Sequence, residues 1–292
     1  MYKLTAIICV FNEERSLITA LRSLRMNKIY HETEIILIDD FSTNVFTRKL
    51  LKRIAKFTRA KVLYSIKNEG LSHSRNLGFS NASSPYVVPI DADDILPDGA
   101  LDDINECFIA NPDADFIFGN YQVESHEGLE SKLVSCSDIC TNGIINSQKL
   151  AANWKLLGTS PCKKATWEAI GGYSMKYSYS VQDVDFWIRV MQRGFKGVYT
   201  DKCIYIWNRS EKGMNMTFDR IFMTELLNDH QSFYSLILPR RVLVNKIFEG
   251  YYPYKQSEIL LPFAHENLFQ LQFKNLLRVF YFLISHHTKK NA

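Results

Sequence analysis

The sequence lacks a long hydrophobic run. No stretch reaches the about 18–20 apolar residues that a membrane-spanning helix needs. The apolar run from Leu4 to Phe11 ends at Asn12-Glu13-Glu14 and has no small-residue cleavage site, which argues against a secretion signal. We therefore expect a cytoplasmic protein, at most peripheral to the inner face of the cell membrane.

Charge of one sign is not in large excess either. The 35 Lys and Arg residues are set against 31 Asp and Glu residues, for a net charge of +4. This balance excludes a strongly basic nucleic-acid binder and leaves room for a local patch that faces phosphates or anionic lipid. The six cysteines are scattered, and Cys136 and Cys140 have no second Cys/His pair at the spacing of a zinc site. In a reducing compartment such cysteines are usually free thiols.

Glycine is missing where nucleotide-binding loops often carry it. The segment that follows the first predicted strand, Val10 to Glu14, contains none. A dinucleotide-dependent dehydrogenase is excluded, because its G-x-G-x-x-G loop belongs at this place. A sugar nucleotidyltransferase usually carries a Gly-rich loop with Arg or Lys there, so it is disfavoured but stays an alternative.

The 292 residues do contain an alternation of short apolar strands and amphipathic helices. Strands are predicted at Leu4–Val10, Glu34–Ile38, Lys61–Ser65 and Tyr86–Ile90, and helices at Ser16–Leu24, Val45–Phe57 and Ser72–Asn81. This order predicts an α/β fold with a mostly parallel central sheet and helices on both faces. Three of the four strands end in polar clusters, and ligands of open α/β sheets bind beyond the carboxyl ends of the strands.

The sharpest of these clusters is Asp91-Ala92-Asp93-Asp94, directly after the fourth predicted strand. Three carboxylates within four residues repel one another, so a cation or strong hydrogen-bond donors are expected nearby. Oxygen ligands suit a hard cation such as Mg²⁺ or Mn²⁺ that is shared with substrate phosphates. The alternative is a solvated turn, because Pro97-Asp98-Gly99 follows.

A second cluster, Asp39-Asp40, follows the second predicted strand. A carboxylate there can accept hydrogen bonds from the N–H and O–H groups of a nucleobase or ribose. The alternative is a helix start, in which Ser42 or Thr43 caps the next helix.

A further polar segment, Asn68-Glu69-Gly70, leads into the helix that carries Arg75. Gly70 permits a close approach of the backbone to a ligand. Arg75 can reach a diphosphate or pair with one of the aspartates. An ordinary surface ion pair is the alternative for Arg75.

A later segment, Gln182-Asp183-Val184-Asp185-Phe186-Trp187, alternates carboxylates with apolar residues. A carboxylate fixed near aromatic groups is suited to act as a general base, since desolvation raises its pKa towards working pH. A helix N-cap is again the alternative.

In this order the segments resemble the motifs of nucleotide-sugar-dependent glycosyltransferases with the GT-A fold, often called family 2. The matching segments are Val10 to Glu14 (V-x-Y-N-x-E in the family, with Phe for Tyr here), Ile36 to Asn44 (V-x-D-D-x-S-T-D), Asn68 to Gly78 (N-x-G-x-x-x-A-R-N-x-G), Asp91 to Asp94 (D-x-D-D), Gly171 to Tyr173 (G-G-F/Y) and Gln182 to Trp187 (E-D-x-D-L-W). The resemblance covers roughly residues 4 to 210.

The resemblance implies an inverting glycosyltransferase that moves a sugar from a nucleotide-diphosphate donor, preferably UDP, to a hydroxyl of a glycan or lipid-linked acceptor in surface polysaccharide synthesis. It implies Asp183 as the catalytic base and Asp91 and Asp93 as the residues that hold Mn²⁺ or Mg²⁺. The implied donor site consists of Phe11, Asn12, Glu13, Asp39, Asp40, Asn68, Gly70, Arg75, Asp91, Ala92 and Asp93. The implied acceptor contacts are Gly172, Tyr173, Gln182 and Trp187.

Two departures from the family pattern bear on these roles. Gln182 stands where the family usually has Glu, and Tyr205 to Glu211 offers no counterpart of the usual late metal-binding histidine. Asn208 or a water is the expected substitute for that ligand. A catalytically impaired protein that only binds nucleotide-sugar or glycan is therefore a second alternative.

The resemblance also divides the chain. Residues 1–217 are expected to form the GT-A catalytic domain, with a nucleotide-sugar-binding half at 1–100 and an acceptor-binding half at 101–217, and residues 218–292 a helical extension. In the extension an apolar helical face with interleaved basic residues is predicted from Leu268, Leu271, Leu276, Phe280 and Leu283 with Lys274 and Arg278, followed by Lys289 and Lys290. Such a helix suits a membrane surface. The alternative is packing on the catalytic domain or on a second subunit, and the oligomeric state stays open.

Overall fold

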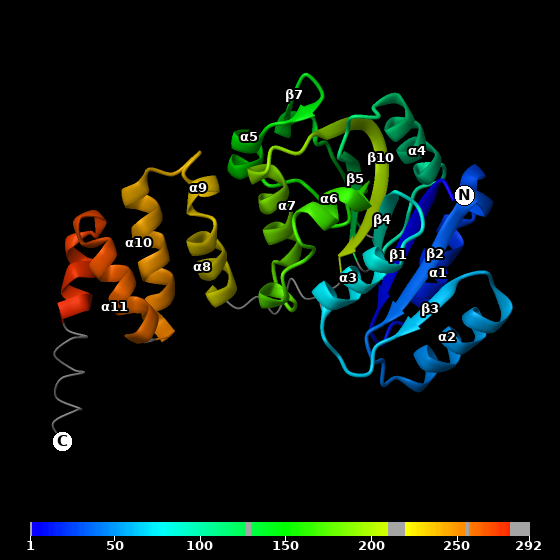
Figure 1. The fold of residues 1–292 in the computed structure, drawn as a ribbon, viewed down its shortest axis with the longest axis horizontal. Helices are drawn as coiled ribbons and strands as arrows, with labels where there is room; N and C mark the ends of the chain where they lie inside the picture. The colour runs from blue at the N-terminus through cyan, green and yellow to red at the C-terminus, as the bar shows by residue number, and fades with distance from the viewer. Residues whose placement is uncertain (1, 126–129, 210–219, 255–256, 281–292) are drawn as a thin grey trace. The chain divides into compact units, whose positions relative to one another are not determined.

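The computed structural model describes residues 2–125, 130–209, 220–254 and 257–280. By its internal contacts the chain divides into two compact units, Met1–Thr217 and Phe218–Ala292. The first unit combines a sheet with helices and the second is helical (Figure 1). Within the described residues, no helix is long and apolar enough to cross a bilayer.

In the first unit strands and helices alternate along the chain. The first elements are β1 (Leu4–Val10), α1 (Arg15–Leu24), η1 (Lys28–Glu32), β2 (Thr33–Asp39), α2 (Val45–Phe57), β3 (Lys61–Tyr64), α3 (Leu71–Asn81), β4 (Tyr86–Asp91) and α4 (Ala100–Ala110). The remainder are β5 (Phe116–Ser125), β6 (Ser131–Val134), η2 (Ser137–Ile139), β7 (Cys140–Thr141), β8 (Ile144–Ile145), α5 (Ser147–Ala152), β9 (Cys162–Lys163), α6 (Lys164–Ala169), η3 (Met175–Tyr177), α7 (Gln182–Gln192) and β10 (Gly197–Arg209). The strands and helices predicted between residues 4 and 91 differ from these bounds by at most one residue at either end.

The strands form one sheet in the order β3-β2-β1-β4-β9-β5-β10-β8-β7, with β6 paired to β5 beside this row. Neighbours among β3, β2, β1 and β4 are parallel, and so are β5 and β10. The short β9 joins the two groups through antiparallel pairing. The predicted mostly parallel α/β fold is thereby confirmed. Because β2, β1 and β4 are parallel neighbours, the polar segments that follow them lie at one edge of the sheet.

β1 is apolar except for Thr5, and β2 is apolar from Ile35 to Ile38, because both faces of these strands are buried. Helix α3 packs on both strands. At Gly78 the approach is close: a Cβ there would lie 3.0 Å from Ile38 and 3.1 Å from Ile7. This contact fixes the position of α3, which carries Arg75 on its buried side.

In the second half of this unit an aromatic core fixes α7. The Trp187 ring lies 4.7 Å from Phe116 of β5, and the Tyr173 ring stacks on Phe186 at 4.2 Å with an interplanar angle of 13°. All four rings are fully or almost fully buried. Rings of this size contribute much of the packing energy of a core, so the first turn of α7 is held on a rigid base.

The second unit surrounds helix α10 (Arg240–Tyr251). Its other elements are α8 (Arg220–Asp229), α9 (Gln231–Tyr234), η5 (Tyr252–Tyr254), α11 (Ser257–Glu266) and η6 (Leu268–Gln270), followed by helical residues 273–280. Its core is formed by Leu243, Val244, Ile247, Phe248, Tyr251, Leu260, Phe263, Ala264 and Leu271.

The single apolar face predicted near the C-terminus is wrong in detail. Leu271 is buried in the core of the second unit and Leu276 packs against it, whereas Leu268 and Phe280 are exposed. Leu268 belongs to η6, and the helix of residues 273–280 directs Leu276 inward and Phe280 outward. Leu283, Lys289 and Lys290 lie outside the described residues.

Candidate active site

The loops after β1 and β2 are joined through Asn12. Its side-chain oxygen accepts hydrogen bonds from the backbone N–H groups of Thr43 and Asn44, both at 2.8 Å. The backbone N–H of Asn12 donates to Ser42 Oγ at 2.9 Å. The cap of α2 is Asn44, whose side chain accepts from Phe46 and Thr47, so the expected cap at Ser42 or Thr43 is wrong.

The two aspartates after β2 differ in what they hold. Both oxygens of Asp40 accept from the next loop, from the backbone N–H of Glu69 at 2.9 Å and of Gly70 at 2.8 Å. Asp39 accepts from the N–H of Ser42 through Oδ1 at 2.9 Å. Asp40 thus shapes the Asn68–Gly70 loop, and Asp39 is the better placed of the pair to meet a ligand.

The Asn68–Gly70 loop is fitted closely against a later segment. Gly70 has φ +83°, and a Cβ there would lie 2.5 Å from Ser178 Oγ. Ser178 Oγ donates to the carbonyl of Glu69 at 2.8 Å. Glycine is required at residue 70 by both the backbone conformation and the space.

The acidic segment after β4 is fastened to β10. The Tyr205 hydroxyl donates to Asp94 Oδ2 at 2.8 Å, and the N–H of Asn208 donates to Asp94 Oδ1 at 2.8 Å. The Asn208 side-chain amide donates to the carbonyl of Asp93 at 2.7 Å. Asp94 is buried by these contacts, whereas Asp91 and Asp93 are only partly buried. Asp94 therefore holds the segment in place, and Asp91 and Asp93 remain for a ligand.

Burial, followed by the crowding of negative charge in this segment, raises carboxyl pKa values. Burial and the neighbouring charges of Asp91 and Glu13 raise the pKa of Asp93 to about 7. Burial, then Asp91 and Asp93, also raise the pKa of Asp94. Such shifts indicate a site that a cation would complete.

The donor set fits a hard cation only in part. Among the described residues no three His, Cys, Asp or Glu side chains gather into a complete metal site. The carboxylates of Asp91 and Asp93 match a cation that takes one or two protein carboxylates and fills its other positions with phosphate oxygens and waters. The residues thus suit a cation that arrives with a diphosphate.

Arg75 lies buried beneath the acidic segment, with 2% of its surface exposed. Its Nη2 donates to Asp91 Oδ1 at 3.0 Å, and its guanidinium lies 5.4 Å from the centre of the Tyr173 ring. In the described part of the chain, Nε and Nη1 have no hydrogen-bond partner. The alternative of an ordinary surface ion pair is wrong, because the guanidinium of Arg75 is buried while the side chain of Asp91 is 34% exposed.

Asp183 lies in the first turn of α7 and its side chain is partly buried. The residue that precedes the helix is Val181, with φ 47°, so the N-cap alternative for Asp183 is wrong. Desolvation raises the pKa of Asp183, and the positive charge of Arg75 opposes that rise. A Cβ at Gly158 would lie 2.5 Å from Asp183 Oδ2. Glycine at residue 158 therefore leaves room for this carboxylate.

The residues expected to contact the acceptor are buried in the interior of the fold. Trp187 is fully buried, and Gly172, Tyr173 and Gln182 are buried as well. The side chains of Trp187 and Tyr173 pack in the aromatic core, so an acceptor contact through either of them is wrong. Aromatic residues beside a motif look the same in the sequence whether they face a ligand or the core.

Three residues that sequence reasoning missed emerge from this geometry. Tyr205 of β10 donates a hydrogen bond to Asp94 of the acidic segment, and Gly158 leaves room for Asp183. Phe41, in the loop that follows Asp39 and Asp40, adopts a left-handed backbone conformation. Only Gly158 carried a sequence signal, as a glycine in an otherwise irregular segment. The roles of Tyr205 and Phe41 depend on contacts across the sheet.

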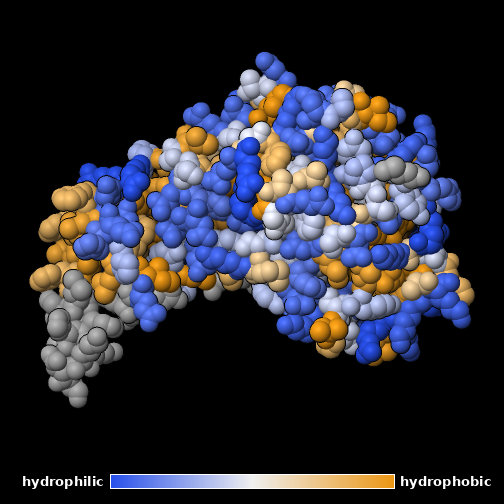
Figure 2. All heavy atoms as spheres, in the orientation of Figure 1, coloured by the Kyte–Doolittle hydropathy of each residue, from blue (hydrophilic) through white to orange (hydrophobic). Residues whose placement is uncertain are grey.

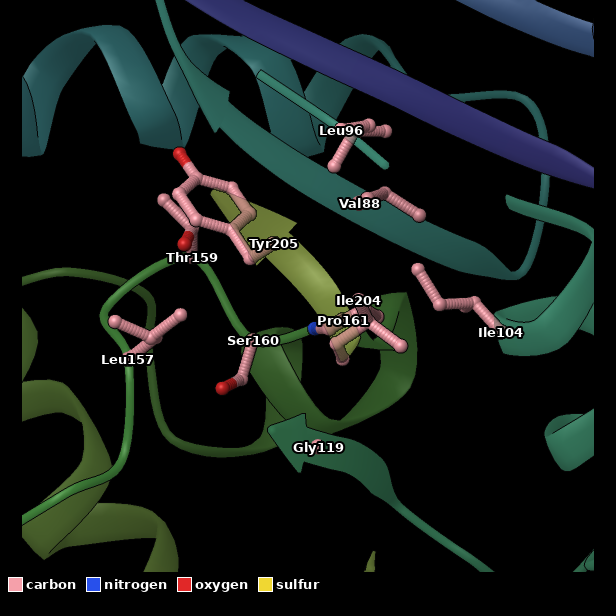
Figure 3. Close-up of a pocket in the computed structure, with 10 residues that line it drawn as sticks. All are labelled: Val88, Leu96, Ile104, Gly119, Leu157, Thr159, Ser160, Pro161, Ile204 and Tyr205. Carbon is pink, nitrogen blue, oxygen red and sulfur yellow. The ribbon is translucent and has the colours of Figure 1, made fainter. Parts of the chain in front are cut away.

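An enclosed cavity of about 10 Å³ lies behind the acidic segment (Figure 3). Its walls include Leu96, Ile204, Tyr205 and the segment that carries Thr159 and Ser160. This volume has room for about one water molecule. The cavity is a packing gap of the interior and does not hold a substrate.

The model of one protein family, "Glycosyl transferase family 2", matches residues 5–167. The chain belongs to this family. This membership is what the motifs predicted. The matched residues include β1 from its second residue, β2 to β4, and the polar segments that follow these strands.

Individual relatives resemble this chain over parts of their length. GlyG of Streptococcus pneumoniae is 25% identical over 158 residues, which are 52% of this chain and 51% of GlyG. TarP of Staphylococcus aureus, a poly(ribitol-phosphate) beta-N-acetylglucosaminyltransferase, is 34% identical over 128 residues, 42% of this chain and 38% of TarP. The chain thus spans about half the length of GlyG and less of TarP.

Solved structures show the same fold. The crystal structure of S. aureus TarS 1–349 in complex with UDP-GlcNAc matches with a TM-score of 0.66 at 16% identity, covering 97% of this chain and 80% of that chain. At this identity the likeness shows the fold and nothing finer. The GT-A fold predicted for this chain is confirmed.

Proposed function

We propose that this chain is an inverting glycosyltransferase that takes its sugar from a nucleotide-diphosphate donor, UDP by preference. The observation that carries the proposal is Arg75, whose buried charge pairs with Asp91 and also influences Asp183. The positive charge of Arg75 thereby acts on the donor-side carboxylate of Asp91 and on the carboxylate of Asp183, the proposed base. The TarS structures in complex with UDP-GlcNAc and with UDP support the choice of uridine.

In the proposed reaction Asp183 accepts the proton of the acceptor hydroxyl. The hydroxyl oxygen forms a bond to the anomeric carbon as the bond from that carbon to the diphosphate oxygen breaks on the opposite face. The configuration at the anomeric carbon inverts in this single displacement. Asp183 is suited to the role because burial raises its pKa while Arg75 limits the rise.

Asp91 and Asp93 would hold Mn²⁺ or Mg²⁺ together with the donor diphosphate. When bound, the cation supplies charge neutralisation for the leaving nucleoside diphosphate. Asn208 is the candidate for a further oxygen ligand. Its side-chain nitrogen already donates to the carbonyl of Asp93, which keeps the amide beside the acidic segment.

The sugar that we propose is a hexose or an N-acetylhexosamine, and the acceptor is a glycan or a lipid-linked glycan of surface polysaccharide synthesis. Relatives such as TarP, named for N-acetylglucosaminyl transfer to poly(ribitol-phosphate), support this class. No nucleic acid is expected as a partner, since basic and acidic residues nearly balance.

The test is nucleotide binding followed by turnover. Thermal stabilisation by UDP, GDP, CDP and ADP is measured with and without Mn²⁺ on wild type, Asp93→Ala and Asp183→Asn. At a nucleotide concentration 100-fold above Kd the expected stabilisation is about 2.7 kcal/mol. We expect UDP to bind wild type and Asp183→Asn with Mn²⁺, and Asp93→Ala to lose that binding.

Turnover separates the alternatives. Release of UDP from UDP-sugar by wild type and its loss in Asp183→Asn support the enzyme. Tight UDP binding without release for any supplied acceptor would instead support the impaired binding protein. Pyrophosphate release from UTP and a sugar 1-phosphate would support a nucleotidyltransferase.

We also propose that the C-terminal unit meets an anionic lipid surface. The exposed stripe of Phe269, Phe273, Leu277 and Phe280 supports this, with exposed fractions between 53% and 96%. Figure 2 shows hydrophobic surface on this unit. From Asn267 to Phe280 the sequence has no Asp or Glu but contains Lys274 and Arg278. Lys274 pairs with Glu249 at 2.7 Å, so these three residues leave one net positive charge, which suits negatively charged headgroups.

Vesicle sedimentation tests this contact. Wild type is expected to pellet with phosphatidylglycerol-containing vesicles and less with phosphatidylcholine alone. Phe273→Ser with Phe280→Ser should stay in the supernatant, and Phe57→Ser, an exposed aromatic of α2, should behave as wild type. Lipid-free wild type that forms oligomers which the double variant does not form would favour a second copy as the partner of the stripe.

A further inference from the structure

Phe41 stands in a backbone conformation that bulky residues avoid. Among the described non-glycine residues, positive φ values occur at Asn12, Phe41, Asn142 and Val181. Asparagine tolerates this region, whereas a bulky side chain there is an outlier. Phe41 has φ 63°. It lies in the loop after β2, between the aspartate pair and Ser42.

The surrounding hydrogen bonds keep Phe41 in this state. On one side Asp39 Oδ1 accepts from the N–H of Ser42, and on the other Ser42 Oγ accepts from the N–H of Asn12. Asp40 is fixed by its bonds to the Asn68–Gly70 loop. The loop therefore cannot relax the residue between these contacts without breaking them.

Core packing does not account for the strain. The Phe41 side chain is 49% exposed, so about half of the ring's surface gains nothing from burial. Residues held in sparsely populated backbone conformations cluster at active sites and ligand-binding sites. About half of the Phe41 side chain is therefore open to contact with a ligand.

The neighbouring strand ends show which ligand the ring would meet. Phe11 follows β1 and Tyr64 ends β3, the strands on either side of β2, and both are about half exposed. Asp39 lies between these strands and is 4% exposed. The edge thus offers apolar ring faces around one hydrogen-bond acceptor, which matches a flat heterocycle with an N–H at its edge.

We propose that Phe41 stacks on the nucleobase of the donor and contributes to nucleotide affinity. The inference rests on the proposed function, since it assigns a further binding residue within the nucleotide site. The left-handed backbone at Phe41 is then the conformation that turns the ring towards the base.

The experiment compares Phe41→Gly, Phe41→Leu and Asn142→Gly with wild type. Asn142 is the matched control because it also has positive φ but lies in the turn between β7 and β8. Affinities for UDP and for inorganic pyrophosphate, both with Mn²⁺, are measured by calorimetry, and unfolding midpoints are measured without ligand.

We expect Phe41→Gly to bind UDP roughly 5- to 100-fold more weakly, the range of one aromatic–base stack. Its pyrophosphate affinity should be unchanged and its unfolding midpoint no lower than that of wild type, because glycine adopts this conformation without strain. Phe41→Leu should lose UDP affinity similarly and gain no stability. Asn142→Gly should bind UDP as wild type does.

Equal UDP affinity in wild type and both Phe41 variants would overturn the stacking role and leave the proposed function standing. An equal loss of UDP and pyrophosphate affinity would also overturn it, since the damage would then lie in the loop. Absence of nucleotide binding by wild type itself would overturn both proposals together.

Discussion

Nη2 of Arg75 and Oδ1 of Asp91 lie 3.0 Å apart, and the arginine that makes this contact is almost fully buried. The same guanidinium opposes the rise in the pKa of Asp183. One cation in the interior therefore influences both the donor-side carboxylates and the base. Replacing it should change two measurable properties at once.

Arg75→Gln should shift the pH dependence of turnover. The base must be ionised, so kcat/KM falls as pH drops below the pKa of Asp183. Without Arg75 that pKa rises further, so the acid limb of the profile should move to higher pH. UDP affinity should fall as well, because Asp91 loses its partner.

The matched control is Arg189→Gln, on the same helix as Asp183. Arg189 pairs with Asp185 at 2.7 Å. This variant should leave the acid limb unchanged. An acid limb that stays in place in Arg75→Gln would mean that Arg75 acts on the donor side only.

Gly158→Ala should impair turnover and spare nucleotide binding. The new methyl group would lie 2.5 Å from Asp183 Oδ2 and 2.6 Å from its Cβ, so the carboxylate must move. Misplacement of a catalytic group by about 1 Å can cost about 100-fold. We expect kcat to fall about 10- to 100-fold with an unchanged Kd for UDP.

A double-mutant comparison isolates the cause. In an Asp183→Asn background, Gly158→Ala should have little further effect on turnover, because the group that it displaces is already inactive. A full additional loss would show that residue 158 acts elsewhere.

Tyr205→Phe should loosen the acidic segment. The hydroxyl donates to Asp94 at 2.8 Å and accepts from the N–H of Asp91 at 3.1 Å. Removing it leaves buried polar groups without a partner, which costs about 1–3 kcal/mol of unfolding free energy. Mn²⁺-dependent UDP affinity should fall too.

Tyr199→Phe is the control for this change, since its hydroxyl also belongs to β10 but donates to Asn120 at 2.8 Å. It should lower stability and leave UDP affinity intact. If both variants weaken UDP binding equally, the effect comes from β10 as a whole.

Asp93→Asn should stabilise the ligand-free protein at high pH. The folded-state pKa of Asp93 is about 7, above the ordinary value of 3.8. The folded state therefore holds more protons between these values, and its stability falls as pH rises from about 4 to 7. Removing the charge should restore on the order of 1–2 kcal/mol at pH 8 and little at pH 4.

Urea denaturation at both pH values checks this sign. Asp113→Asn is a control of the opposite sense, because a hydrogen bond from Lys196 lowers the pKa of Asp113. Its stabilising effect is present above the ordinary pKa, so the variant should be weakened at pH 8 rather than strengthened. Equal behaviour of the two variants would contradict the assignment for Asp93.

The strands and helices of residues 4–91 were predictable because each buried strand is a short apolar run between polar clusters. Their parallel order followed from the alternation of elements. The position of the acidic segment and of Asp183 followed from the motifs. These features can be recognised from short stretches of the sequence.

Burial was not predictable in the same way. Trp187 reads as an acceptor contact beside Asp183 but lies in the core, and Arg75 reads as a surface cation but lies inside. Whether a side chain faces a ligand or the interior depends on what packs against it from distant elements. Tyr205, 114 residues from Asp91, shows how far such contacts reach.

The hydrogen bonds among Asp94, Tyr205 and Asn208 restrict how these residues can change among related proteins. A change at Asp94 alone leaves a buried hydroxyl and a backbone N–H without an acceptor, and a change at Tyr205 alone leaves a buried carboxyl with one donor fewer. Substitutions at these positions should therefore be tolerated mainly in pairs, such as an apolar pair of similar volume. In a collection of related chains, residues 94 and 205 are expected to covary, whereas Asp91 and Asp93 should change independently of residue 205.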